Sequence, residues 1–222
     1  MQTRPLLLGH RGARFEKTIS ENTPAAFDYA LASGCDGFEF DIHLTADGQA
    51  VIWHDDSVRG RKIAESSAAE LRLPLLHEVL ARYRDTAFLD IELKAAGVEM
   101  IVVDLLRSTR PTRGLIVSSF LPEVLLMARR LDPSIPLGLI CETHEQLRRW
   151  SSLAIDYVIP HCGLIRQDVI MGIKAARKKV LTWTVNLPGE MQRLEKWGVD
   201  GIISDHPGRL VATLNPAGQK QS

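Results

Sequence analysis

Residues 37–54 read GFEFDIHLTADGQAVIWH, and this stretch decides the fold. The runs 37–44 and 50–54 are rich in apolar and aromatic residues, a composition typical of strands. Asp47 and Gly48 stand between them, and an Asp-Gly pair between two such runs predicts a hairpin turn. The second run is therefore predicted to be the return arm of a hairpin, not a new parallel strand.

Outside this hairpin, strand-like and helix-like segments alternate along the chain. Eight strands remain, each followed by a helix, which predicts an α/β protein with a (β/α)8 TIM barrel and a β-hairpin extension after the second strand. The predicted strands are Leu6–His10, Gly37–Leu44, Ala87–Leu93, Leu115–Phe120, Leu137–Cys141, Tyr157–His161, Val180–Val185 and Gly201–Ser204. The predicted helices are Pro24–Ser33, Leu76–Arg84, Val98–Ser108, Pro122–Arg130, His144–Trp150, Arg166–Lys178, Glu190–Trp197 and Pro207–Leu214. With no internal repeat or linker, residues 1–222 are expected to form a single barrel domain.

The amino-acid composition indicates which binding partners and which cellular compartment to expect. The 222 residues include 27 basic and 27 acidic side chains, so the zero net charge gives no electrostatic reason to expect nucleic acid or an anionic membrane as a partner. The three cysteines have neither disulfide-framework nor zinc-site spacing, which favours a reducing compartment. The N-terminal apolar run is too short for a secretory signal, and no run of about 18 apolar residues exists. A cytoplasmic protein without a transmembrane segment is expected, with its oligomeric state open.

Three carboxylates are predicted to meet at the end of the barrel where such proteins place their working groups. Glu39 and Asp41 are two residues apart on a strand and so share one face, and Glu92 ends the next barrel strand. Converging carboxylates repel one another unless a cation neutralises them, and oxygen ligands suit Mg²⁺ or Ca²⁺. Alternatively, Glu39 and Asp41 are separate surface charges, although their neighbours Phe38 and Phe40 would then make an unpaired charge costly.

Two histidines are expected beside this cluster. A turn centred on Asp47 and Gly48 pairs residues whose numbers sum to about 95, or to about 94 with a one-residue bulge. Either register returns His54 to the neighbourhood of Asp41, and His10 ends the adjacent first strand. Such a pair suits one general base and one general acid. The alternative is that each histidine is structural.

Two cations share this rim. Arginine favours bidentate contacts with phosphate oxygens and lysine acts as a point charge, so Arg11 and Lys94 are predicted to bind a phosphoester. For Lys94 the alternative is a salt bridge to Glu92 or Asp41.

Three further residues near the predicted rim are candidates for binding or structural roles. Trp183 is predicted either to form a wall of the pocket or to belong to the core, and Phe120 to be core or an apolar pocket wall. Asn22, just before Thr23 and Pro24, is interpreted as a helix-capping residue.

Together these motifs resemble the glycerophosphodiester phosphodiesterase family. The resembling stretches are His10-Arg11-Gly12, Glu21-Asn22-Thr23, residues 39–48, His54-Asp55, Ile91-Glu92-Leu93-Lys94, Ser119-Phe120, Trp183-Thr184-Val185-Asn186 and residues 198–207. The resemblance implies a phospholipase-C-like phosphodiesterase barrel that hydrolyses glycerophosphodiesters to sn-glycerol 3-phosphate and an alcohol, with Mg²⁺ or Ca²⁺. The matching positions imply the following roles: Glu39, Asp41 and Glu92 as metal ligands, His10 and His54 as the acid–base pair, Arg11 and Lys94 as phosphate-side cations, and Trp183 as a pocket aromatic.

The sequence departs from the family after the His54-Asp55 pair. The family inserts a small module there, whereas only 20 residues separate His54 from Leu75 here. Residues 57–74 are therefore interpreted as a shortened insertion, which leaves the pocket mouth less covered. A lysophospholipase D, or a lyase that forms cyclic phosphates, would use the same site. A non-catalytic protein that binds phosphodiesters is the remaining alternative.

Overall fold

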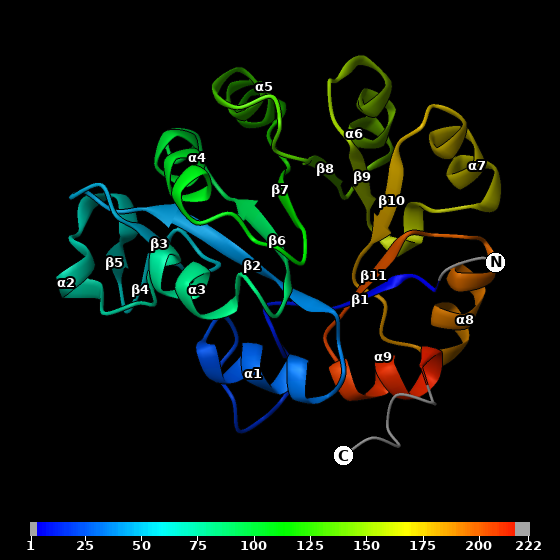
Figure 1. Ribbon diagram of the computed structural model, residues 1–222, viewed down its shortest axis with the longest axis horizontal. Coiled ribbons are helices and arrows are strands. Elements are labelled where there is room, and N and C mark those ends of the chain that lie inside the picture. Colours follow the sequence, from blue (N-terminus) through cyan, green and yellow to red (C-terminus); the bar gives the residue numbers. More distant parts are fainter. Residues whose placement is uncertain (1–3, 216–222) are drawn as a thin grey trace.

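Eight parallel strands close into a ring surrounded by helices (Figure 1). The structure is a computed structural model that describes residues 4–215. The barrel closes because β1 pairs with both β2 and β11, through Leu8 opposite Gly37 and Ile203. The predicted TIM barrel is thereby confirmed. Its strands are β1 (Leu6–Gly9), β2 (Gly37–Leu44), β6 (Phe88–Leu93), β7 (Leu115–Ser119), β8 (Leu137–Cys141), β9 (Tyr157–Pro160), β10 (Lys179–Thr182) and β11 (Gly201–Ser204).

The eight predicted helices are present in the predicted order, most of them with shifted ends, and α2 is a short ninth helix that was not predicted. The described helices are α1 (Pro24–Ala32), α2 (Ala68–Leu71), α3 (Leu76–Tyr83), α4 (Glu99–Ser108), α5 (Pro122–Leu131), α6 (His144–Arg148), α7 (Gln167–Ala175), α8 (Pro188–Lys196) and α9 (Pro207–Leu214). Helix α8 begins at Pro188 instead of Glu190, since a proline fits the first helical position. The segment predicted to continue α6 to Trp150 becomes a 3₁₀ helix, Arg149–Ser152. The other two 3₁₀ helices are Ile63–Glu65 and Cys162–Leu164.

Successive side chains of β2 point alternately to the core between the barrel and its helices and to the barrel interior, where the site lies. Phe38 and Phe40 face outward, where Phe38 stacks on Phe27 of α1 with ring centroids 4.1 Å apart, and all three are fully buried. The intervening Glu39 and Asp41 therefore face the barrel interior. Below them, a second apolar cluster that includes Leu8, Ile116, Ile140, Ile159 and Ile203 fills the interior.

The predicted hairpin is present. Strand β3 (Ala50–Ile52) runs antiparallel to β2, with Ile42 opposite Ile52, which is the register whose numbers sum to 94. The chain then forms the short strands β4 (Ser57–Val58) and β5 (Arg61–Lys62), which project beside the barrel with α2 (Figure 1). Within residues 4–215, no helix has the length and apolar character needed to cross a membrane.

Candidate active site

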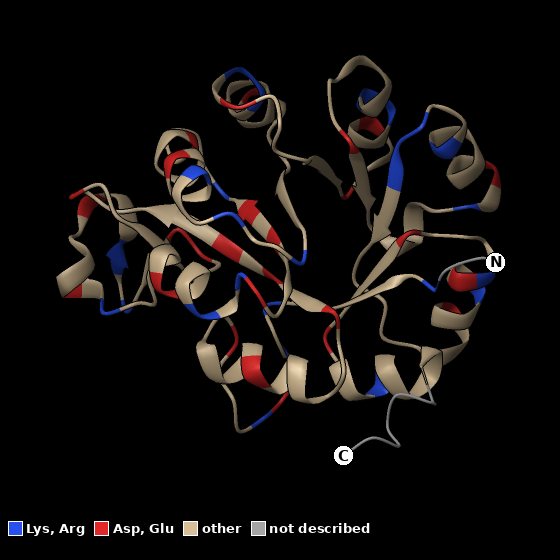
Figure 2. Ribbon diagram, in the orientation of Figure 1, with Lys and Arg blue, Asp and Glu red and all other residues tan. Residues whose placement is uncertain are grey.

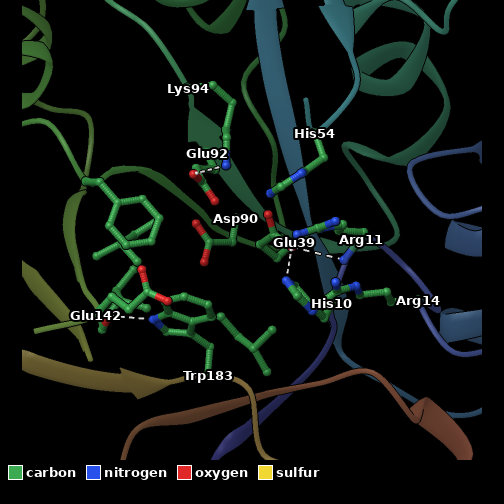
Figure 3. Close-up of a pocket in the computed structure, with 14 residues that line it drawn as sticks. His10, Arg11, Arg14, Glu39, His54, Asp90, Glu92, Lys94, Glu142 and Trp183 are labelled. Carbon is green, nitrogen blue, oxygen red and sulfur yellow. Dashed lines mark hydrogen bonds and ion pairs between the residues drawn. The ribbon is translucent and has the colours of Figure 1, made fainter. Parts of the chain in front are cut away.

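A cavity of about 410 Å³ opens at the carboxyl ends of the barrel strands (Figure 3). It brings together eight of the nine predicted site residues: His10, Arg11, Glu39, His54, Glu92, Lys94, Phe120 and Trp183. The ninth, Asp41, is 1 % exposed and lies beside them, opposite Glu92 in the pairing of β2 with β6. Figure 2 shows acidic residues on these two neighbouring strands.

The three carboxylates converge as predicted. Glu39, Asp41 and Glu92 each offer an oxygen, and these atoms all lie within 4.8 Å of one another. Glu39 Oε2 accepts a hydrogen bond from the backbone N–H of Arg11 at 2.9 Å, while its Oε1 is buried without a hydrogen-bond partner. A buried oxygen without a donor, among three clustered acids, is a position that a hard divalent cation fits.

Repulsion between the clustered carboxylates contributes to raised pKa values of Glu39 and Glu92. Burial, followed by the charges of Asp41 and Glu92, raises the pKa of Glu39 well above its usual range. Burial and Asp41 likewise raise the pKa of Glu92 to about 7. Burial also acts against the charged form of Asp41, but Lys94 and Arg11 outweigh it and hold the pKa of Asp41 below its usual range. A bound cation would relieve the remaining repulsion, so the donor set fits Mg²⁺ or Ca²⁺.

The two rim cations contact the acids directly. Lys94 Nζ lies 2.8 Å from Glu92 Oε1 and 3.3 Å from Asp41 Oδ1, so the salt bridges considered from the sequence are present. Arg11 donates to Glu21 Oε1 at 2.7 Å and places its Nε 3.4 Å from Asp41 Oδ2. Both side chains also line the cavity, where they can approach an anion.

His10 is oriented by Asp205, a carboxylate that was not among the predicted site residues. Its Nδ1 lies 2.6 Å from Asp205 Oδ1, and Asp205 accepts a second hydrogen bond from Asn186 Nδ2 at 2.6 Å. The other ring nitrogen, Nε2, lies 3.8 Å from Glu39 Oε2. Burial lowers the pKa of His10 despite the opposing Asp205 bond, which favours the neutral imidazole. Its position directly after the last barrel strand could have identified Asp205 as a site residue from the sequence.

His54 reaches the cavity from the end of the hairpin. Its Nδ1 lies 2.7 Å from Asp55 Oδ1, and its side chain is 35 % exposed. The imidazole Nε2 of His43 lies 3.1 Å from the His54 carbonyl oxygen and so fixes the backbone. Both predicted histidines therefore have a carboxylate partner on Nδ1.

Asn22 corrects the capping interpretation. The N-cap of α1 is Thr23, whose hydroxyl accepts from the Ala26 N–H at 3.3 Å. Asn22 instead donates from Nδ2 to Asp41 Oδ2 at 2.8 Å. Its φ of +57°, in the left-handed region that asparagine tolerates, turns the side chain into the barrel.

Asp90 is a second residue that sequence reasoning missed. It lies two residues before Glu92 on β6, on the same face, and lines the cavity. Ser118 Oγ donates to Asp90 Oδ1 at 2.6 Å, while Asp90 Oδ2 is buried without a hydrogen-bond partner. Burial raises the pKa of Asp90 to about 7. Its spacing of two residues from Glu92 could have identified Asp90 as a site residue from the sequence.

The two aromatic candidates line the cavity and also contact the core. Trp183 and Phe120 are half-buried and pack on the interior apolar cluster, with ring centroids 5.6 Å apart in a T-shaped arrangement. Trp183 Nε1 donates to the Ile159 carbonyl at 3.0 Å, which fixes the indole. Trp183 and Phe120 thus each form part of the pocket wall and also pack against the core.

Comparison with known proteins identifies the relatives of this chain. A model of the glycerophosphoryl diester phosphodiesterase family matches residues 10–72 and 61–209. A glycerophosphodiester phosphodiesterase of Caldanaerobacter subterraneus is 30 % identical, over 96 % of this chain and 99 % of the relative. A phosphodiesterase of Oleispira antarctica, solved with the product sn-glycerol-3-phosphate, has a TM-score of 0.84 at 27 % identity, over 96 % of this chain and 97 % of that one. A glycerophosphodiester phosphodiesterase structure from Parabacteroides distasonis shares the fold, with a TM-score of 0.86 at 22 % identity, over 99 % and 100 % of the two chains.

Proposed function

Because the chain belongs to the glycerophosphoryl diester phosphodiesterase family, we propose that it hydrolyses glycerophosphodiesters to sn-glycerol 3-phosphate and an alcohol, with Mg²⁺ or Ca²⁺. The observation that carries the proposal is the placement of His10 and His54 in one cavity with Glu39 and Glu92 (Figure 3). A base, an acid and a cluster of metal-ligating oxygens are the groups that phosphodiester cleavage requires.

Glu39, Asp41 and Glu92 would hold the divalent cation in this proposal. When bound there, a divalent cation would supply positive charge to stabilise the charge that develops on the phosphoryl oxygens. Lys94 and Arg11 add positive charge at the same edge of the cavity, and Asn22 keeps the Asp41 carboxylate in place through its 2.8 Å bond.

The two histidines divide the proton transfers. By family resemblance the neighbouring glycerol hydroxyl attacks phosphorus, and His10, neutral and with Nδ1 bound to Asp205, accepts its proton at Nε2. His54, bound to Asp55 and more exposed, gives a proton to the departing alcohol oxygen. Water then opens the resulting cyclic phosphate to give glycerol phosphate. Reversing these roles would exchange acid and base without changing the site.

The proposal extends to domain organisation and location. In this proposal residues 1–222 form a single domain, and residues 57–74, the region of β4, β5 and α2, are a shortened insertion. A cytoplasmic location is supported by the free cysteines Cys35, Cys141 and Cys162, as expected in a reducing compartment.

The test is release of sn-glycerol 3-phosphate from glycerophosphocholine and glycerophosphoethanolamine, with Mg²⁺, Ca²⁺ or EDTA. Metal-dependent release supports the proposal, and absence of release with either metal contradicts it. Phosphorus NMR of the products separates hydrolysis from a lyase, which would leave a cyclic phosphate. Lysophospholipids assayed in parallel test the lysophospholipase D alternative.

A further inference from the structure

Glu142 is a charged residue of the cavity that the mechanism above does not use. It follows directly after β8, is exposed, and lines the cavity together with Trp183. Its backbone N–H donates to Gln146 Oε1 at 2.8 Å, which holds the main chain at this point. Among the described residues 4–215, no lysine, arginine or histidine forms an ion pair with its carboxylate. The carboxylate is therefore available to a cation from solution.

The indole of Trp183 is the second feature of this side of the cavity. His161 and Phe120 meet it in T-shaped contacts at 5.5 and 5.6 Å, and the indole N–H is bound to the Ile159 carbonyl. These contacts hold the ring rigidly. In the part of the chain that the structure describes, no lysine or arginine lies over this ring, although Lys94 lies 5.9 Å from the ring centroid of Phe120. A rigid indole beside an unpaired carboxylate is an arrangement that binds ammonium groups.

The two arginines of the cavity and Glu142 lie on opposite sides of it. Figure 3 shows Arg11 and Arg14 on one side, beside His10, and Glu142 beside Trp183 on the other. A phosphate held by the basic side and the metal ligands would direct one of its two substituents toward Glu142. The walls there are apolar, formed by Ile140 and Ile159 among others, and suit the methyl groups of a quaternary ammonium.

We propose that Glu142 and the face of Trp183 form a subsite for a positively charged head group. Diesters of choline or ethanolamine are then preferred to diesters of uncharged alcohols. This inference rests on the proposed function and adds to it the chemical class of the leaving alcohol. Glu142 acts on specificity only, because it lies apart from the predicted acid–base pair and the three metal-ligating carboxylates.

The test compares glycerophosphocholine with its uncharged carbon isostere, the 3,3-dimethylbutanol diester of glycerol phosphate. The two head groups have the same shape, and the difference in their leaving-group reactivity is the same for every variant. A change in the ratio of their kcat/KM values between variants therefore reports the charge contact. The wild type is expected to favour choline, and Glu142→Gln to lower the ratio by about fivefold, the value of one partly exposed charge contact. Glu142→Lys is expected to lower it by roughly tenfold or more, since attraction becomes repulsion.

Glu145→Gln is the matched control. Glu145 is an exposed glutamate three residues further along that pairs with Arg149 at 2.9 Å and does not line the cavity, so its substitution should leave the ratio as in the wild type. Raising the ionic strength should lower the wild-type ratio but change that of Glu142→Gln much less. A wild-type ratio near one, or equal ratios for the wild type and Glu142→Gln, overturns the subsite and leaves the proposed function intact. A wild type that cleaves neither diester overturns the proposed function and the subsite together.

Discussion

His10 Nδ1 lies 2.6 Å from Asp205 Oδ1, although 195 positions separate the two residues in the chain. The contact exists because β1 and β11 are neighbours in the closed barrel, with Gly9 opposite Ser204. A carboxylate on one ring nitrogen fixes the tautomer and directs the other nitrogen, Nε2, toward the cavity. The carboxylate at the end of the last strand thus positions the histidine at the end of the first.

Replacing this carboxylate should slow catalysis and shift its pH dependence. Asp205→Asn is expected to reduce kcat/KM by about 10²–10³-fold, because the preferred tautomer is lost. The Asp205 bond raises the pKa of His10 against the effect of burial, so its removal lowers that pKa further. The ascending limb of the pH–rate profile should move to lower pH. Asp168→Asn, at an exposed pair with Arg166, is the control. An unchanged rate and profile for Asp205→Asn would show that the carboxylate does not act on His10.

Both predicted acid–base histidines should be needed for turnover. His10→Ala and His54→Ala are each expected to lower kcat by about 10²–10⁴-fold, the usual contribution of a positioned acid or base. Circular dichroism and the melting temperature should show that the fold is retained. His77→Ala, at an exposed position on α3, serves as the control and should keep the wild-type rate. Near-normal turnover by His54→Ala would contradict its assignment as the acid.

Metal binding should depend on pH and on Glu92. The pKa of Glu92 is raised to about 7 by burial and Asp41, so a bound divalent cation must displace a proton below that pH. Mg²⁺ affinity is expected to rise by up to about tenfold per pH unit between pH 6 and 7, and to level off above. Calorimetry in two buffers of different ionisation enthalpy measures the released proton.

Substitution of the same residue tests the ligand assignment. Glu92→Gln is expected to weaken Mg²⁺ binding by about tenfold or more, because a neutral amide replaces a charged ligand. Glu123→Gln, at an exposed position in the first turn of α5, should bind as the wild type does. Equal affinity of Glu92→Gln and the wild type would remove Glu92 from the ligand set.

Buried Asp90 should make the metal-free protein less stable at high pH. Burial raises its pKa to about 7, so between about pH 4 and 7 the folded state holds a proton that the unfolded state has released. The free energy of unfolding should therefore fall as pH rises through this window. Asp90→Asn removes this titration and is expected to stabilise the protein by about 1–3 kcal/mol at pH 8, with little change at pH 4.

Urea denaturation in EDTA at several pH values measures this effect. EDTA removes any divalent cation that would change the charges of the cavity. Ser118 Oγ can still donate to the carbonyl oxygen of the substituted asparagine, so the existing hydrogen bond is retained. Destabilisation of Asp90→Asn at pH 8 would show that the carboxylate is charged and stabilising there.

Short-range patterns in the sequence were sufficient for much of the site. Glu39 and Asp41 alternate with Phe38 and Phe40, and a period of two assigns the acids to one face of β2 before any tertiary structure is known. Asp47-Gly48 likewise indicated the hairpin that brings the chain back to His54, in one of the two registers considered. Both inferences concern residues within one strand or one turn, where local geometry decides.

Contacts between distant segments were decided only by the closed barrel. No local rule pairs Asp205 with His10, places Asn22 against Asp41, or sets Glu142 beside Trp183. Each depends on which strands become neighbours and on the direction in which loops enter the cavity, and the sequence pattern around one residue contains neither. The sequence therefore determined the alternation of core and site residues and the order of strands and helices. Tertiary structure decided the partners that orient the predicted histidine and carboxylates, because those partners come from other segments of the chain that only the closed barrel brings beside them.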